Sequence, residues 1–371
     1  MRLGAFYFVY FAYAAAMVAY FPLYLSSRGL NAGEIALVLA LPQLARIFAP
    51  TLWGWLADRT GAQRGIVAFS CAAMAVGFPA LALANGAWGI ALIVGLMSVL
   101  SAGALPIVEA LALASLAGAP GRYGPIRLWG SIGFIAVVLG GGAWLDAKPV
   151  SGLPMALGAL ALVALGVSAG LPSVNVHARV HEKRPLPNSS AIRSLLAAGF
   201  CMAAAHGVLY AFLTLHLQRI GYSGTTIGML WSLGVVAEIL IFLYLPAIFR
   251  RYSLATLLLA SLALGVARFL AIGWLAGVLV ILLLAQLLHA ATFGLFHAAS
   301  VAAVHRIFPG SAQGLGQTLF SSLSYGAGGA AGALAGGWGW ERGGPTLAFT
   351  LAALAALIGA YFAYRLKRAG L

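Results

Sequence analysis

Long runs of hydrophobic residues alternate with short polar breaks along the whole chain. Each run has about the 20 apolar residues that a helix needs to cross a bilayer core of ~30 Å. Runs of this length with so few charges predict membrane-spanning helices rather than strands. The pattern predicts twelve spans, at residues 4–25, 33–57, 65–84, 88–115, 127–145, 153–172, 193–218, 225–248, 254–273, 277–303, 317–337 and 345–364.

The composition excludes a water-soluble protein. Of the 371 residues, 63% are hydrophobic and 8% are charged, and the mean hydropathy is +1.00. Soluble domains carry roughly a quarter charged residues, so this chain has too few to cover a soluble surface. The fold class predicted is an all-α membrane protein. Cys71 and Cys201 both lie in apolar runs, and two isolated thiols of this kind predict neither a disulfide framework nor a metal site.

The spans divide into two groups of six. The longest polar stretch, residues 173–192, predicts a cytoplasmic linker between an N-terminal bundle, residues 1–172, and a C-terminal bundle, residues 193–371. The halves resemble each other at an offset of 192 residues, which pairs Gly29 with Gly221. Two six-helix bundles with a substrate site between them near the membrane midplane are typical of alternating-access transporters. The pattern predicts such a pair of pseudo-symmetric bundles.

The positive charges lie mostly on one side of the predicted topology. Of the 21 Lys and Arg residues, 15 fall on the cytoplasmic side if the N-terminus is cytoplasmic. The other side has only Arg28, Lys148, Arg219 and Arg342. By the positive-inside rule both termini are cytoplasmic, which predicts a multi-pass protein of a bacterial inner membrane. The net charge of +14 is then explained by membrane topology, so nucleic acid is not an expected partner. The protein is expected to be a monomer that contacts lipid and binds a small solute.

Five ionisable residues lie clearly within predicted spans: Arg46, Glu109, Glu238, Arg268 and His289. A charge inside a span is expensive and marks a functional site by default. Structural alternatives remain open: Glu238 forming only an interhelical salt bridge, Arg46 neutralising an acid of another helix, and Arg268 binding backbone carbonyls.

A stripe of polar and aromatic residues is predicted on the tenth span. Gln286, His289, Phe293 and His297 recur at three- to four-residue spacing, which places them on one helical face. Such a face is expected to border a cavity, with His297 as a candidate substrate contact. For each histidine, ordinary packing is the alternative.

The loop after the second predicted span contains Gly54, Asp58, Arg59, Gly61 and Arg64. In a short turn of this kind, Asp58 is expected to cap or face a helix N-terminus, while the two Arg side chains stay at the anionic membrane surface. This segment resembles the signature loop of the major facilitator superfamily, which implies a role in conformational change for these five residues.

A second resemblance is more specific. Glu109 on the fourth span and Arg127 on the fifth are 18 residues apart, within Pro106–Ala110 and Tyr123–Phe134. These segments look like the lactose permease group, where an acid and an Arg at this separation form the substrate-binding charge pair. At the position of Phe134, members of the group have an indole that stacks on the sugar. This departure from the group points away from a sugar substrate.

The densest resemblance is to the phenylpropionic acid permeases, a branch near lactose permease. The segments Gly221–Ser223 and Leu230–Glu238 carry it, with Arg268 and His289 downstream. It implies that Glu238, Arg268 and His289 take part in proton coupling. The lactose permease network has a further acid three residues after the His, where this chain has Thr292.

These features predict a secondary transporter, and the resemblance implies a proton-coupled symporter that imports an aromatic monocarboxylate related to 3-phenylpropionate. The proton gradient is then the energy source and no cofactor is expected. The alternatives are a sugar or nucleoside symporter, a drug exporter and a membrane receptor without transport activity. An enzyme is not expected, because no nucleophile–base pair or Walker motif occurs. Gly328, Gly332 and Gly336, spaced every fourth residue, predict close helix packing.

Overall fold

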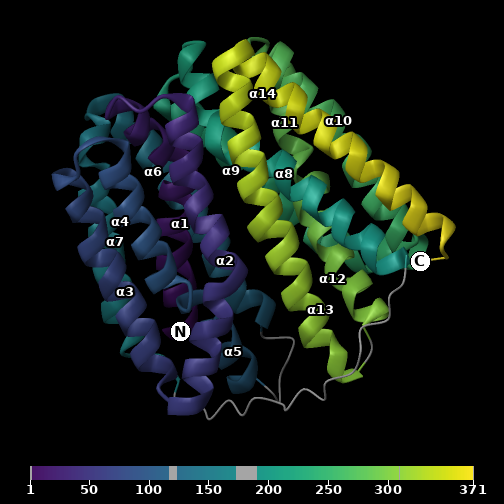
Figure 1. Cartoon of the computed structure of the whole chain (residues 1–371), viewed down its shortest axis with the longest axis horizontal. Helices are drawn as coiled ribbons and strands as arrows, with labels where there is room; N and C mark the ends of the chain where they lie inside the picture. The colour runs from purple at the N-terminus through teal and green to yellow at the C-terminus, as the bar shows by residue number, and fades with distance from the viewer. Residues whose placement is uncertain (1, 117–122, 173–189, 309, 371) are drawn as a thin grey trace. The chain divides into compact units, whose positions relative to one another are not determined.

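The computed structural model describes residues 2–116, 123–172, 190–308 and 310–370, and these residues are almost entirely helical (Figure 1). The linker predicted at residues 173–192 lies for the most part outside the described residues. Up to residue 168 the helices are α1 (Arg2–Ser27), α2 (Ala32–Thr60), α3 (Gln63–Ala80), η1 (Leu81–Leu83), α4 (Gly86–Ser101), α5 (Ala104–Ser115), α6 (Tyr123–Ala147), η3 (Val150–Gly152) and α7 (Leu153–Ser168).

The helices from residue 190 onward include two π-helical segments, η4 and η6. In order they are α8 (Ser190–Arg219), α9 (Gly224–Arg251), α10 (Leu254–Leu275), α11 (Leu279–Leu287), η4 (Ala290–Leu295), α12 (Phe296–Ile307), η5 (Gly310–Ala312), α13 (Gln313–Phe320), η6 (Ser321–Gly328) and α14 (Gly329–Arg368). Each predicted span coincides with one of these helices or with a consecutive group of them.

Eleven stretches of the described chain are helical, long and apolar enough to cross a membrane. The last of them, Gln313–Arg368, has 56 residues. At 1.5 Å per residue it would extend ~84 Å, far beyond a bilayer core of ~30 Å. Its backbone is non-helical at Gly343 and at Gly344, where φ is 65°, and Pro345 follows. Division at this break gives two spans, in agreement with the predicted pattern of twelve.

The described chain forms two compact units. The first consists of described residues of Met1–Arg179 together with Gly221–Ser232, and the second of those of Val180–Ile220 and Leu233–Leu371. In the first unit, α1 packs against α6 and α7, and α3 packs against α7. In the second unit, α8 and α10 pack against α14. The helix α9 therefore begins in one unit and continues in the other.

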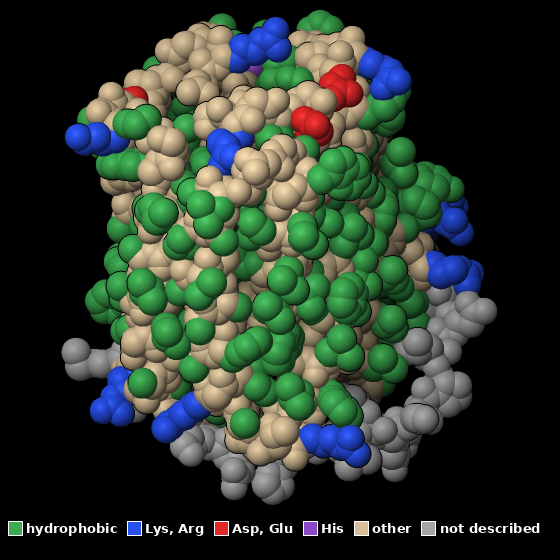
Figure 2. All heavy atoms as spheres, turned by 60° about the vertical axis from the view of Figure 1, so that its left-hand side comes forward, with side chains coloured by type: hydrophobic (Ala, Val, Ile, Leu, Met, Phe, Trp, Pro, Cys, Tyr) green, Lys and Arg blue, Asp and Glu red, His purple; other side chains and the backbone are tan. Residues whose placement is uncertain are grey.

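Hydrophobic and charged side chains separate along the helices. Figure 2 shows hydrophobic side chains covering the middle of the visible face, Asp and Glu near its upper end, and Lys and Arg near its upper and lower ends and along its right-hand edge. Large apolar side chains remain exposed on this protein, including Trp88 at 80% and Leu83 at 83%. Apolar surface of this extent is stable in lipid but not in water, so the structure is that of a multi-pass membrane protein.

The turn after α2 depends on a glycine. Gly61 caps α2 with a left-handed φ of 65°, and its N–H donates to the carbonyl of Ala57. Glycine takes this conformation without steric cost. The prediction that Asp58 caps a helix N-terminus is wrong: Asp58 lies exposed in the last turn of α2. The N-cap of α3 is Ala62, which provides no side-chain cap.

The predicted close packing at Gly328, Gly332 and Gly336 is confirmed. A Cβ atom on Gly328 or Gly332 would collide with the backbone carbonyl oxygen of Phe200 or Ala204 on α8. The carbonyl is main chain and cannot rotate away, so α8 approaches the end of η6 and the start of α14 closely only because these positions lack a side chain.

We expect Gly332→Val to destabilise the second unit by about 1–3 kcal/mol, the usual cost of overpacking. A lower midpoint of thermal unfolding in detergent would be the readout. Gly140→Val is the matched control, because a Cβ at this helical glycine of α6 meets nothing within 4 Å. Equal unfolding midpoints for the two variants would contradict the packing role of Gly332.

Candidate functional site

In the second unit, the predicted proton-coupling residues lie close together. Glu238 on α9 and His289, between α11 and η4, lie side by side, with 3.7 Å between Glu238 Oε2 and His289 Nε2, and they form an ion pair when His289 is protonated. The side chain of Glu238 is 18% exposed and that of His289 is 9% exposed. Glycines make room for both, because a Cβ on Gly294 would meet Glu238 and a Cβ on Gly234 would meet His289. The pair is therefore packed into the helix interface.

Arg268 on α10 is buried at 1% exposure and is held by neutral acceptors. Its Nε donates to the carbonyl of Ala285 at 2.9 Å, and its Nη2 donates to Gln286 Oε1 at 3.2 Å. Its Nη1 donates to Thr292 Oγ1 at 2.9 Å and faces His206 Nε2 at 3.4 Å. Of these four bonds, only the one to Ala285 goes to a backbone carbonyl, which was the structural alternative for Arg268. The fork of the guanidinium joins α8, α11 and η4.

The contacts of His206 on α8 determine its tautomer. Its Nδ1 lies 3.0 Å from the carbonyl oxygen of Met202, and its Nε2 faces the guanidinium of Arg268. A carbonyl oxygen only accepts hydrogen bonds and a guanidinium only donates them. The ring must therefore carry its hydrogen on Nδ1 and present the lone pair of Nε2 to Arg268. In this arrangement His206 is neutral and serves as an acceptor.

The stripe predicted on the tenth span runs through a π-helical segment. The rings of His289 and Phe293 stack at 5.2 Å between centroids, and those of Phe293 and His297 stack at 6.4 Å. His297 Nδ1 lies 2.6 Å from the hydroxyl oxygen of Tyr325. Phe293 belongs to η4 and Tyr325 belongs to η6. π-Helical segments occur frequently at functional sites; the stripe passes through one of them and contacts the other through His297 and Tyr325.

The first unit brings the predicted substrate-binding pair together. Arg127 Nε on α6 is 4.0 Å from Glu109 Oε1 on α5, and both side chains are about one-third exposed, at 33% and 38%. The guanidinium also lies over the ring of Phe11 at 4.0 Å and over that of Tyr7 at 5.4 Å. Aromatic faces attract a cation, so α1 helps to hold Arg127. The break between α4 and α5 lies just before Pro106, as expected for a proline in a span.

The remaining predicted substrate contacts lie separately. The predicted span begins at Arg127, but α6 begins at Tyr123. Arg127 therefore lies one turn inside the helix and not at its end. Phe134 is half-buried, two turns farther along α6. Arg46 lies in the middle of α2 with an exposed side chain. Its role in substrate binding stays a prediction.

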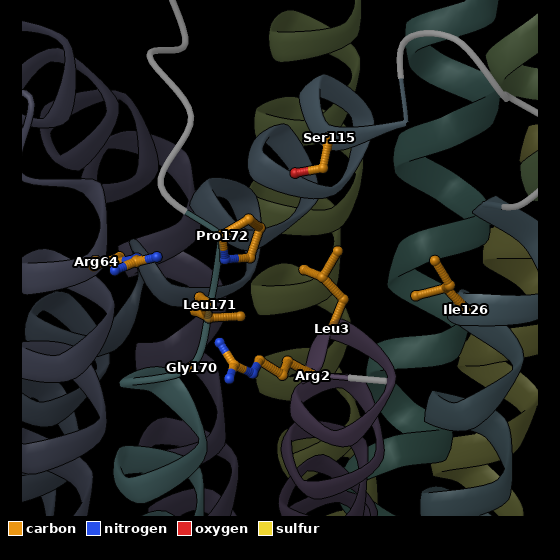
Figure 3. Close-up of a pocket in the computed structure, with 8 residues that line it drawn as sticks. All are labelled: Arg2, Leu3, Arg64, Ser115, Ile126, Gly170, Leu171 and Pro172. Carbon is orange, nitrogen blue, oxygen red and sulfur yellow. The ribbon is translucent and has the colours of Figure 1, made fainter.

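The predicted conformational loop borders a cavity of the first unit. Gly54, Asp58 and Arg59 lie on α2, where Arg59 covers the ring of Trp55 at 4.8 Å. Arg64, in the first turn of α3, and Arg2, in the first turn of α1, both line a cavity of about 450 Å³ (Figure 3). The other lining residues are Leu3, Ser115, Ile126, Gly170, Leu171 and Pro172. Of the candidate site residues, the cavity includes only Arg64.

Sequence reasoning missed three contributions to these sites. Thr292 was noted only for the acid it replaces, whereas it accepts a hydrogen bond from Arg268. His206 was not identified as a partner of Arg268, which its Nε2 faces at 3.4 Å. Asp146, near the end of α6, was not singled out, although it accepts hydrogen bonds from the start of α9. A Ser-Gly-Thr helix start at Ser223 was the available signal. Among the described residues, no three His, Cys, Asp or Glu side chains gather in a way that would hold a metal ion.

Two sequence relatives have described activities. The chain is 30% identical over 311 residues to a probable 3-phenylpropionic acid transporter of Escherichia coli (strain K12), covering 80% of this chain and 79% of the relative. It is 27% identical over 271 residues to a maltose permease of Geobacillus stearothermophilus, covering 72% of this chain and 69% of that protein.

The fold and the family agree with these relatives. The structure is similar to that of a mutant of the nucleoside transporter NupG, with a TM-score of 0.87 at 17% identity over 100% of this chain and 99% of that one. At this level of identity the likeness shows the fold alone. A sequence profile of the MFS_1 like family matches residues 1–351. The chain is therefore a member of the MFS_1 like family, a multi-pass membrane transporter with the major facilitator fold.

Proposed function

We propose that this transporter is a proton-coupled symporter that imports a small aromatic monocarboxylate. The observation that carries the proposal is the pair formed by the half-buried Glu238 and the buried His289, 3.7 Å apart. Both side chains can exchange a proton, and a carboxylate inside a membrane protein changes its charge readily when its surroundings change. Protonation of Glu238 then shifts the equilibrium between the inward-open and outward-open conformations of the transporter.

Three features support an organic anion as the substrate. Among the candidate proton-coupling and substrate-binding residues, the three arginines Arg46, Arg127 and Arg268 outnumber the two acids Glu109 and Glu238. One positive charge is therefore left for a substrate carboxylate. The stacked rings of the tenth span and the aromatic side chains around Arg127 are suited to an aromatic ring. The relative from Escherichia coli is described as a probable 3-phenylpropionic acid transporter.

The absence of an acid at Thr292 is compatible with coupling. In this chain the hydroxyl of Thr292 and the ring of His206 occupy Nη1 of Arg268. Arg268 therefore keeps its charge and its position without a carboxylate. The proton is then exchanged at Glu238 and His289, with Arg268 as a fixed positive charge beside them.

The wild-type protein in proteoliposomes with a trapped pH-sensitive dye is expected to acidify the lumen when 3-phenylpropionate or cinnamate is added outside. The neutral form of such an acid also crosses lipid by itself, so the quantity to compare is the initial rate against protein-free liposomes of the same composition. We expect this rate to be several-fold faster with protein and to saturate with substrate concentration.

The panel also contains lactose, maltose and a nucleoside, which separate the alternative functions. Acidification with maltose, lactose or the nucleoside in place of the acids would identify a sugar or nucleoside symporter. Alkalinisation of the lumen when a solute is added outside would show that protons leave as the solute enters, which is the exchange expected of a drug exporter. Binding of an aromatic acid without any flux would favour a receptor.

We further propose that the protein resides as a monomer in a bacterial inner membrane with both termini in the cytoplasm. The asymmetric distribution of Lys and Arg between the two sets of loops supports this orientation. No cofactor is required by the proposed mechanism, because the proton gradient supplies the free energy.

A further inference from the structure

Asp146, in the last turn of α6, binds the first turn of α9. Its Oδ1 accepts from the N–H of Gly224 at 2.6 Å, and its Oδ2 accepts from the N–H of Thr225 at 2.8 Å and from the Thr225 hydroxyl at 2.6 Å. The first N–H groups of a helix have no partners within the helix, and a carboxylate at this end is favoured by the helix dipole. Asp146 thus caps a helix that begins 78 residues later in the chain.

The backbones of α6 and α9 approach closely beside this cap. A Cβ on Gly142 would collide with the carbonyl oxygen of Gly224, and a Cβ on Gly228 would collide with the carbonyl oxygen of Val138. The hydroxyl of Tyr20 on α1 donates to the same Val138 carbonyl. The first nine residues of α9 therefore belong to the first unit by backbone packing as well as by the cap.

The rest of α9 belongs to the second unit. From Leu233 onward its residues cluster there, and Glu238 and Gly234 pack against Gly294 and His289. The helix is continuous from Gly224 to Arg251, and its one proline, Pro246, lies beyond Glu238. About 21 Å of helix separates Gly224 from Glu238 at 1.5 Å per residue. One stiff element thus joins the Asp146 cap to the proposed proton-coupling pair.

We infer that Asp146 is a latch residue of the transport cycle, whose three hydrogen bonds to Gly224 and Thr225 must break and re-form in each turnover. Any movement of the two units against each other has to bend α9 or separate its start from α6. Bending a helix without a proline or a break costs several backbone hydrogen bonds, whereas the latch involves only three bonds at an exposed carboxylate. Water replaces these bonds readily because Asp146 is exposed, so the latch is the element that opens.

The first test is independent of any substrate. Val138 is buried at 0% exposure behind the latch. In a background where Cys71 and Cys201 are alanine, Val138→Cys should react slowly with a membrane-impermeant maleimide added on the side where α6 ends. Asp146→Ala is expected to accelerate labelling about tenfold, and this factor corresponds to ~1.4 kcal/mol. Asp146→Asn, which keeps one oxygen acceptor, should give an intermediate rate.

Glu34→Ala is the matched control. Glu34 is also an acid at a helix N-terminus, but its carboxylate accepts from the N–H of Asn31 within the cap of its own helix, at 2.9 Å. Its removal should leave Val138→Cys labelling unchanged. Equal labelling in the Asp146→Ala, Asp146→Asn and parent proteins, all monodisperse on size exclusion, would overturn the latch.

The second test rests on the proposed function. Oxidation of a protein with Asp146→Cys and Thr225→Cys should cross-link α6 to α9 and abolish exchange of radiolabelled 3-phenylpropionate, and a reducing agent should restore it. Full exchange by the cross-linked protein would show that these helices stay together through the cycle and would overturn the inference. If even the unmodified protein exchanges no aromatic acid, the proposed substrate is wrong, and the labelling test still decides the latch.

Discussion

Replacing Glu238 by glutamine is expected to reduce proton-driven uptake of the aromatic acid to the level of protein-free liposomes, while exchange of labelled for unlabelled substrate continues. Glutamine has nearly the same shape as glutamate, so the contacts with Gly294 and His289 are kept. Its amide binds no proton at any accessible pH, so the charge of this site no longer changes during the cycle. A transporter fixed in the uncharged state exchanges substrate but is no longer driven by the gradient.

The measurement is the initial rate of uptake driven by a difference of one pH unit, compared with the rate of exchange in the same vesicles. One proton per substrate gives at most about a tenfold gradient for this driving force, because one pH unit corresponds to ~1.4 kcal/mol. Glu34→Gln is the control, since it removes a carboxylate that is only half-buried at the start of α2. Wild-type proton-driven uptake in Glu238→Gln would exclude Glu238 from coupling.

Arg268→Lys is expected to eliminate transport and to lower the thermal stability of the second unit. The guanidinium makes four bonds, to Ala285, Gln286, Thr292 and His206, from three different elements. An ammonium group has three donors and lacks the planar fork, so it leaves at least one buried acceptor unpaired. Each unpaired group costs about 1–3 kcal/mol, and the substitution also moves the charge away from its present position.

Exchange of labelled substrate and the unfolding midpoint in detergent give the two readouts. Arg250→Lys is the control, because Arg250 lies exposed in the last turn of α9 and a lysine there retains the surface charge. Unchanged exchange and an unchanged midpoint in Arg268→Lys would show that the fork geometry is dispensable. A lower midpoint with full exchange would restrict Arg268 to a structural role.

The helical architecture was predictable because lipid leaves the backbone few choices. Every N–H and C=O group in the bilayer core must be paired within the segment, so an apolar run of about 20 residues becomes a helix. The ends were less predictable. α2 continues through Asp58 and Arg59 to Thr60, since intrahelical bonding proceeds until the left-handed turn at Gly61, whatever the polarity of the residues.

The breaks within spans were only partly predictable. Pro106 indicates a disturbance in the fourth span, and the structure divides α4 from α5 just before it. No comparable residue announces the π-helical segments at Ala290–Leu295 and Ser321–Gly328. A single inserted residue is enough to form such a segment, and its stability comes from neighbouring helices rather than from its own sequence.

For the candidate site, the sequence identified which residues carry unusual chemistry but not all of their partners. An ionisable residue inside an apolar run is conspicuous, and so Glu109, Glu238, Arg268 and His289 were found. The structure brings Glu109 to Arg127 and Glu238 to His289. His206 and Thr292 are two of the four partners of Arg268, yet no pattern in their own segments links either residue to it. Their roles in transport stay predictions until the variants are measured.

The sequence by itself determined that this chain is a helical membrane protein, because hydrophobic run length and charge placement depend on local composition, and the resemblance of its motifs indicated the major facilitator superfamily. Only the tertiary structure decided that Arg268 rests on neutral acceptors, that His206 is held as the Nδ1–H tautomer, and that Asp146 caps α9. Each of these depends on distances between segments that are far apart in the chain. Such distances follow from helix packing, to which glycines such as Gly142 and Gly332 contribute by leaving space, and no local pattern encodes which helix fills it.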